Sequence, residues 1–201
     1  MKSVLVRKTG SLLLGLLLIQ LTTQAQASWE VTLLHNINPP DPNSAVWKGF
    51  SNTAKPIAAG IPAGLLVIAL LEKNHPQTYQ AVEMLGGLAI TTIATEGLKQ
   101  IVKRPRPYQT YPDIHYDQYD NSPSFPSGHV SVAFSTATSL WITTHHWWIG
   151  VPALAWATGV GYSRMYLGQH YPSDVLAGAA IGVASAWAAH WLRHQLFDKK
   201  K

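Results

Sequence analysis

The chain has 201 residues, of which 47% are hydrophobic and only 12% are charged, so charge is scarce compared with an ordinary soluble domain. Its length predicts one domain and argues against a second. The formal net charge of +5 does not indicate a nucleic-acid partner, because the basic residues gather at the termini and in short motifs. The chain has no Cys, which excludes disulfides and thiol chemistry.

The first 27 residues have the pattern of a signal peptide. Basic residues begin the chain, an apolar run follows over 12–21, and Ala25 and Ala27 place small side chains at the spacing that a signal peptidase recognises. We expect cleavage after Ala27, with an uncleaved membrane anchor over 1–27 as the alternative. In either case the chain is exported.

Residues 28–55 form a polar, proline-rich segment. The run Asn38 to Pro42 (NPPDP) is typical of turns, so we expect irregular structure here with a short helix near Trp47 at most. A helical domain is then expected over 56–198. Five apolar segments of helical length fall within it: Ile57 to Leu71, Val82 to Ile101, Val130 to Thr144, Trp147 to Tyr162 and Val175 to Leu192. The fold class is therefore all-α, a bundle of about five core helices.

The scarcity of charge predicts that this bundle crosses a membrane. From Val130 to Leu192 the only charged residues are Arg164 and Asp174, too few to wet one face of each helix. A soluble or peripheral bundle is the alternative. The positive-inside rule puts Lys199 to Lys201 on the cytoplasmic side, and the motifs below then lie at the periplasmic helix ends, whether or not the N-terminal anchor is retained. We expect a bacterial inner-membrane protein, or alternatively a soluble periplasmic one.

The first motif is Lys99 to Pro107 (KQIVKRPRP). Proline cannot continue a helix and favours extended backbone in the residue before it, so Lys99 ends a helix and Arg106 stands on an extended segment. Lys103 and Arg104 are interpreted as a topology signal or an anchor to lipid headgroups.

The second motif, Pro126 to His129 (PSGH), opens a helix. Free backbone N–H groups at a helix start attract anions, and Gly128 leaves room for a phosphate to approach the backbone. Ser127 is either part of that anion site or an ordinary N-cap. His129 points at whatever binds there.

The third motif is Ser163 to Asp174 (SRMYLGQHYPSD). Proline is favoured in the first turn of a helix, so Pro172 begins the last helix, with His170 just before it and Asp174 in its first turn. An Asp that accepts the N–H of this imidazole would leave the other ring nitrogen free to attack. A structural His–Asp pair is the alternative.

Taken together, the patterns Lys-x6-Arg-Pro, Pro-Ser-Gly-His and Ser-Arg-x5-His-x3-Asp resemble the signature of the type 2 phosphatidic acid phosphatase superfamily. That superfamily includes lipid phosphatases, class A acid phosphatases and vanadium haloperoxidases. The eleven specified positions match in order: Lys99, Arg106, Pro107, Pro126, Ser127, Gly128, His129, Ser163, Arg164, His170 and Asp174.

The resemblance implies a role for each of these side chains. His170 would be the nucleophile that forms a phosphohistidine, Asp174 would orient it, and His129 would be the general acid and base. The phosphoryl oxygens would be held by Lys99, Arg106, Ser127, Gly128 and Arg164. No metal or other cofactor is implied, since fixed cations and a helix start stabilise the transferred phosphoryl group.

The resemblance thus predicts a metal-independent phosphatase that hydrolyses a lipid phosphate or diphosphate, with membrane lipids as its other partners and no obligatory protein partner. The alternatives are a soluble periplasmic acid phosphatase for small phosphomonoesters, a haloperoxidase, and a non-catalytic lipid-binding or transport protein.

The acidic loop over 108–125 is interpreted as a solvated substrate-access loop rather than a metal site.

Overall fold

The computed structural model describes residues 29–198; the expected signal peptide over 1–27 and the basic end, Lys199 to Lys201, lie outside the described residues. The described part is all helix, without a strand, as predicted. A helix over 29–37 comes first. It is followed by α2 (Ala45–Leu71), α3 (His75–Val102), α4 (Pro107–Thr110), α5 (Gly128–Thr144), α6 (Trp147–Tyr166), α7 (Pro172–Arg193) and the π-helical turn η1 (His194–Asp198).

The beginning of α2 differs from the expectation. Helix was expected from Ile57, after an irregular segment, yet α2 begins at Ala45 and contains Pro56 and Pro62. A proline inside a helix removes one backbone hydrogen bond. Here the helix continues because its small side chains are buried against the bundle on both sides of Pro56, notably Ser51, Ala54 and Ala58.

Helix α5 is the centre of the bundle and packs against α2, α3, α6 and α7. Its closest neighbour is α7, where a Cβ atom at Gly182 would lie 2.3 Å from the Ser131 carbonyl oxygen and one at Gly178 would lie 2.7 Å from that of Ser127. The small residues Gly178 and Gly182 therefore permit a close approach of α7 to α5.

Three helical stretches are long and apolar enough to cross a membrane, namely Ala45–Leu71, His75–Thr110 and Pro172–Leu196. Helices α5 and α6 are not among them, although spans were expected there as well. Large apolar side chains on the outer faces of α2, α3 and α7 are exposed, including Leu65, Ile68, Leu71, Ile101, Trp187 and Trp191. In lipid these side chains would be favourably solvated.

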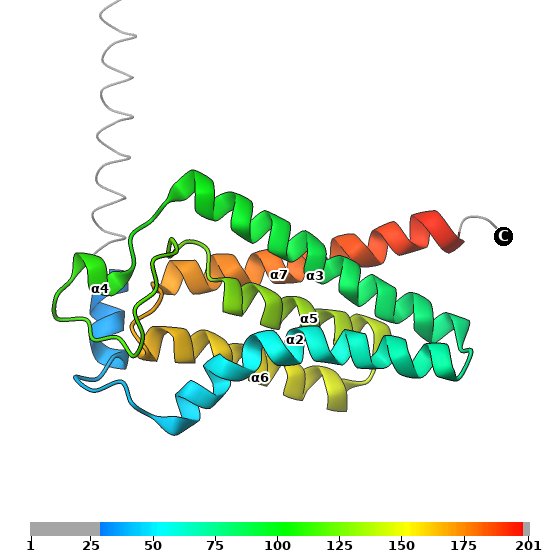
Figure 1. The fold of residues 1–201 in the computed structure, drawn as a ribbon, viewed down its shortest axis with the longest axis horizontal. Coiled ribbons are helices and arrows are strands. Elements are labelled where there is room, and N and C mark those ends of the chain that lie inside the picture. The colour runs from blue at the N-terminus through cyan, green and yellow to red at the C-terminus, as the bar shows by residue number, and fades with distance from the viewer. Residues whose placement is uncertain (1–28, 199–201) are drawn as a thin grey trace, which may run out of the picture.

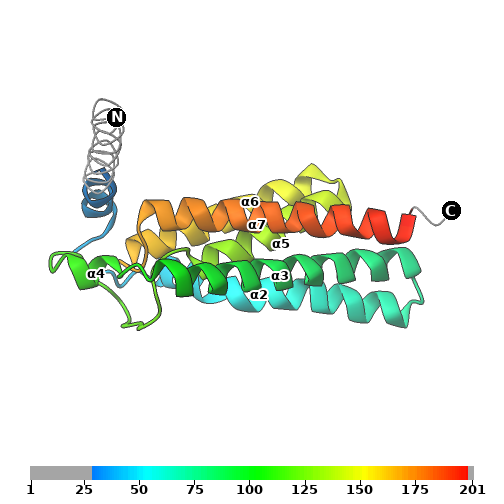
Figure 2. The same cartoon turned by 90° about the horizontal axis from the view of Figure 1, so that it is seen from above.

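The five long helices run side by side (Figures 1 and 2). The chain direction places the end of α3, the end of α6 and the starts of α5 and α7 at one end of the bundle, together with α4 and the helix over 29–37 (Figure 1). Helix α7 finishes at the opposite end. All three motifs are therefore brought to one end of the bundle by helix packing.

Candidate active site

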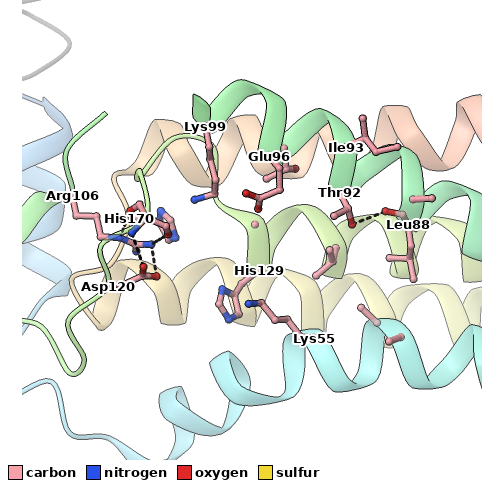
Figure 3. Close-up of a pocket in the computed structure, with 17 residues that line it drawn as sticks. Lys55, Leu88, Thr92, Ile93, Glu96, Lys99, Arg106, Asp120, His129 and His170 are labelled. Atoms are coloured by element: carbon pink, nitrogen blue, oxygen red, sulfur yellow. Dashed lines mark hydrogen bonds and ion pairs between the residues drawn. The ribbon is translucent and has the colours of Figure 1, made fainter. Parts of the chain in front are cut away.

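A cavity of about 630 Å³ opens at this end of the bundle. Five of the predicted site residues line it: Lys99, Arg106, Gly128, His129 and His170. Figure 3 shows that Lys99 from α3, His129 from α5 and His170 from the α6–α7 loop face the same space. The other three predicted residues, Ser127, Arg164 and Asp174, do not line it and are buried in the wall around it.

Helix α5 begins at Gly128, as the sequence predicted, and Ser127 occupies the N-cap position. The Ser127 side chain makes no capping hydrogen bond, and its Oγ atom is buried without a partner among the described residues. A Cβ atom at Gly128 would meet only the Thr95 Cγ2 atom, at 3.8 Å, so the backbone here is open on the cavity side. An anion at this helix start would meet free N–H donors.

His170 is held through Ser124 rather than by Asp174 directly. The Nδ1 atom of His170 lies 3.7 Å from Asp174 Oδ2, which is too long for a hydrogen bond. Ser124 Oγ contacts both groups, 3.3 Å from His170 Nδ1 and 2.5 Å from Asp174 Oδ2. Since a carboxylate only accepts, Ser124 donates to Asp174 and its oxygen remains an acceptor for Nδ1–H. The expected direct contact is thus replaced by a bridge, which still leaves Nε2 without a proton.

The electrostatic setting keeps the His170 imidazole neutral. Burial lowers the pKa of His170 to about 3, and the nearby Asp174 carboxylate opposes only part of that decrease. A neutral imidazole has one ring nitrogen with a free electron pair. His170 is therefore in the form that a nucleophile needs at neutral pH.

Arg106 is almost fully buried, on an extended segment as predicted, and every N–H of its guanidinium is used. Nε donates to Ser122 O at 3.0 Å, and Nη1 donates to the carbonyl and side-chain oxygens of Gln169 at 3.1 and 3.0 Å. Nη2 donates to Ser122 Oγ at 2.9 Å and to Asp120 Oδ2 at 2.6 Å. The charge of Arg106 faces the cavity, but a phosphate would have to displace Asp120 to take its donors.

Lys99 and Arg164 each have N–H groups without a hydrogen-bond partner among the described residues. Lys99 Nζ donates to Pro123 O at 2.5 Å, so two of its three N–H groups are available to a ligand. Arg164 Nη1 donates to Ser51 Oγ at 2.6 Å, whereas its Nε is buried with no partner among the described residues. Buried donors are normally paired, so an unpaired donor in the wall of the cavity is available to an anionic ligand.

Arg104 and Glu30 support Asp174, a role that the sequence did not predict for either residue. Arg104 Nη1 donates to Asp174 Oδ1 at 2.8 Å, and Arg104 Nη2 donates to Glu30 Oε2 at 2.6 Å. The guanidinium also lies over the Tyr171 ring, 3.8 Å from its centroid. The interpretation of Arg104 as a topology signal or lipid anchor is wrong, because its head group is turned inward by two buried carboxylates.

Most residues of the loop over 108–125 are exposed, and two of its carboxylates bond to residues at the site. Asp120 pairs with Arg106, and Asp117 Oδ1 accepts a hydrogen bond from Gln169 Nε2 at 3.0 Å. The Arg106 guanidinium and the Ser122 amide lower the pKa of Asp120 against the opposing effect of its burial. Within residues 29–198 no group of three or more His, Asp or Glu side chains is arranged to hold a metal ion.

Curated proteins with similar sequences include several named as lipid phosphatases. The chain is 38% identical over 72 residues to lipid A 4'-phosphatase of Bacteroides thetaiotaomicron, 36% of this chain and 32% of that protein. It is 30% identical over 102 residues to an undecaprenyl-diphosphatase of Sulfolobus acidocaldarius, 50% of this chain and 49% of that protein. It is also 36% identical over 132 residues to bacitracin transport permease protein BcrC of Bacillus licheniformis, 65% and 64% of the two chains. The matches thus span about a third to two thirds of these relatives.

Two solved structures share the fold. LpxE of Aquifex aeolicus superposes with a TM-score of 0.66 at 24% identity, over 80% of this chain and 94% of that one. A transmembrane PAP2-type phosphatidylglycerolphosphate phosphatase of Bacillus subtilis gives the same TM-score at 23% identity, over 87% and 88%. The family model of the PAP2 superfamily matches residues 80–198, which include all three motifs. The chain therefore belongs to the PAP2 superfamily.

Proposed function

We propose that this protein is a metal-independent phosphatase that hydrolyses a lipid phosphate or diphosphate through a phosphohistidine intermediate at the periplasmic face of the membrane. Its membership of the PAP2 superfamily and the names of the relatives support the class of substrate. The observation that carries the proposal is the cavity, in which His170, His129 and Lys99 face one another. The part of the cavity beyond them has mostly apolar walls and is called the apolar arm.

The reaction would proceed in two displacements. His170 Nε2 attacks the phosphorus atom, the bond from phosphorus to the lipid oxygen breaks, and His129 gives its proton to that oxygen. Water then attacks the phosphohistidine while His129 takes a proton from it, and inorganic phosphate leaves. Lys99, Arg106 and Arg164 would balance the charge that the phosphoryl oxygens carry in both steps.

The shape of the cavity supports a lipid rather than a small phosphoester. Beyond the histidines its walls are mostly apolar side chains of α2, α3 and α5, among them Ala58, Ala59, Leu88, Ile93 and Val132. A small phosphomonoester would leave this arm filled only with water, whereas an alkyl chain would bury it. The three apolar helices favour a membrane location over the soluble alternative.

Phosphate release in detergent tests the activity. Purified protein with EDTA present should release inorganic phosphate from a lipid phosphate, and His170→Ala should abolish release. Wild-type enzyme quenched during turnover on ³²P-labelled substrate should carry an acid-labile, base-stable label, which His170→Ala should lack. Full activity in the His170→Ala variant, or complete loss of wild-type activity in EDTA, would contradict the proposal.

Orientation can be tested directly, because the chain contains no Cys of its own. Gln118 is exposed in the loop at the site end, and Glu72 is exposed in the turn between α2 and α3 at the other end. In intact cells a membrane-impermeant maleimide should label the Gln118→Cys variant and not the Glu72→Cys variant. The reverse pattern would place the site on the cytoplasmic side.

A further inference from the structure

One cation in the cavity belongs to none of the three motifs. Lys55 stands on α2, outside the residues that match the family model, and it lines the same cavity as His129 and His170. Its side chain is exposed there and makes no hydrogen bond or ion pair with any residue in the described part of the chain. A lysine that partners nothing inside a mostly apolar cavity is available to a ligand.

The position of Lys55 relative to the histidines is specific. Figure 3 shows its amino group beside the His129 ring, while Arg106 and His170 lie on the other side of that ring. Burial and the charges of Arg164 and Lys55 lower the pKa of the His129 imidazole, and an anionic substrate beside it would oppose that effect. Past Lys55 the cavity wall is mostly apolar, with Ala58 and Ala59 on the same helix. Lys55 thus lies between the reacting groups and the apolar arm.

This position corresponds to one part of the substrate. In the proposed reaction His129 protonates the leaving oxygen, so the group bonded to that oxygen lies beside His129 and next to Lys55. In a lipid monophosphate that group is the alcohol of the lipid, whose carbon atoms next to the oxygen are uncharged and do not attract a cation. In a lipid diphosphate it is the second phosphate, which is anionic and well matched to a lysine.

We propose that Lys55 binds the second phosphate of a lipid diphosphate, which makes diphosphates the preferred substrates; this inference rests on the proposed function. His170 Nε2 bonds to the terminal phosphorus, and the bridging P–O bond breaks with its electron pair left on the bridging oxygen. That oxygen takes the proton of His129, and the lipid monophosphate formed leaves with its charge opposite Lys55.

Glu96 is an acidic residue in the same cavity, so its charge could be what Lys55 balances. It lines the cavity from α3, beside Lys99 and across the cavity from Lys55 (Figure 3). If Lys55 served only to balance Glu96, the neutral variants Lys55→Met and Glu96→Gln would change turnover of every substrate alike. The two roles can therefore be separated by comparing substrates that differ only in the second phosphate.

The experiment compares farnesyl diphosphate with farnesyl monophosphate in one detergent, with kcat/KM measured for each. Wild-type protein should prefer the diphosphate. Lys55→Met should lower the ratio of the two kcat/KM values about tenfold or more, the effect of losing a charge-assisted hydrogen bond. Lys55→Arg should keep most of the preference. Lys48→Met is the matched control, because Lys48 is on the same helix but bonds to Asn43 instead of lining the cavity, and its ratio should equal the wild-type ratio.

Each other outcome overturns a distinct claim. If Lys55→Met leaves the ratio unchanged, or wild-type protein hydrolyses the monophosphate and not the diphosphate, the role of Lys55 is wrong while the proposed function stands. If neither substrate is hydrolysed, or His170→Ala is as active as wild type, the proposed function itself fails. If Lys55→Met does not fold, inhibition of wild-type monophosphate hydrolysis is measured instead. Farnesyl methylenediphosphonate should inhibit more strongly than farnesyl phosphonate. Equal or weaker inhibition would overturn the role of Lys55.

Discussion

Arg104 Nη1 lies 2.8 Å from Asp174 Oδ1, and this ion pair joins the first motif to the third at the buried back of the cavity. Asp174 Oδ2 accepts from Ser124 Oγ at 2.5 Å and from the Tyr171 amide at 2.9 Å. Three donors from three parts of the chain thus fix one carboxylate. Glu30 extends the network, since it pairs with Arg104 and accepts from the Ser173 amide at 3.1 Å.

Arg104→Ala should lower kcat about 10- to 100-fold with little change in KM. The variant leaves two buried carboxylates without their shared cation, and hydrogen bonds to charged groups contribute about 1.5–3 kcal/mol. Arg104→Lys should recover part of the activity. Steady-state kinetics in detergent measure this, and Lys103→Asn is the control, because Lys103 is exposed and asparagine tolerates its positive φ of 49°. An Arg104→Ala enzyme with wild-type kcat would refute the positioning role.

Ser124→Ala should reduce kcat about tenfold. The variant removes the hydroxyl that bridges His170 and Asp174, so the imidazole loses the acceptor for Nδ1–H and its orientation is no longer fixed. The exposed neighbour Asn121 serves as the control, and Asn121→Ala should be unaffected. Thermal unfolding of both variants in detergent should be compared as well. A loss of kcat that merely follows a loss of folded protein would count against the bridge.

The pH dependence of stability should carry a contribution from His170. Its pKa falls from an ordinary 6.5 to about 3 on folding, so the unfolded chain binds the proton more tightly. The stabilising effect of a neutral His170 is therefore complete above pH 6.5 and is lost as the pH falls through the interval from 6.5 to about 3.

Unfolding temperatures of wild type and of His170→Asn, which cannot titrate, measure this effect. On lowering the pH from neutral to about 4, the wild type should lose more stability than the variant. Parallel curves for the two proteins would show that His170 does not titrate as its buried position requires.

Gly182→Ala should destabilise the protein by roughly 5 °C or more in unfolding temperature. The added Cβ would lie 2.3 Å from Ser131 O and 2.7 Å from Ser135 N, so α7 must move away from α5. That movement would also separate Asp174 on α7 from the start of α5. Gly97→Ala is the matched control, because a Cβ there meets nothing within 4 Å, and alanine in a helix is favoured over glycine. Equal unfolding temperatures would argue against tight α5–α7 packing.

Residue types and their spacing along the chain predict the helical bundle and most of the residues around the cavity. The apolar segments predicted the bundle, and Pro105, Pro107 and Pro172 marked where helices must stop or start, because proline restricts its own backbone and that of its neighbour. The start of α7 at Pro172 follows this signal, and α5 starts at Gly128 within the second motif. The residue types and spacing of the motifs selected the groups that line or surround the cavity.

Tertiary packing decided which groups support those residues. Nothing in the sequence pairs Glu30 with Arg104, Ser124 with Asp174, or Lys55 with the cavity, because such contacts depend on how helices and loops meet rather than on spacing along the chain. The early start of α2 is a similar case: packing of Ser51, Ala54 and Ala58 outweighs the local cost of Pro56. Short-range rules therefore predicted most of the helices and the side chains proposed to react, and long-range contacts determined the orientation of those side chains.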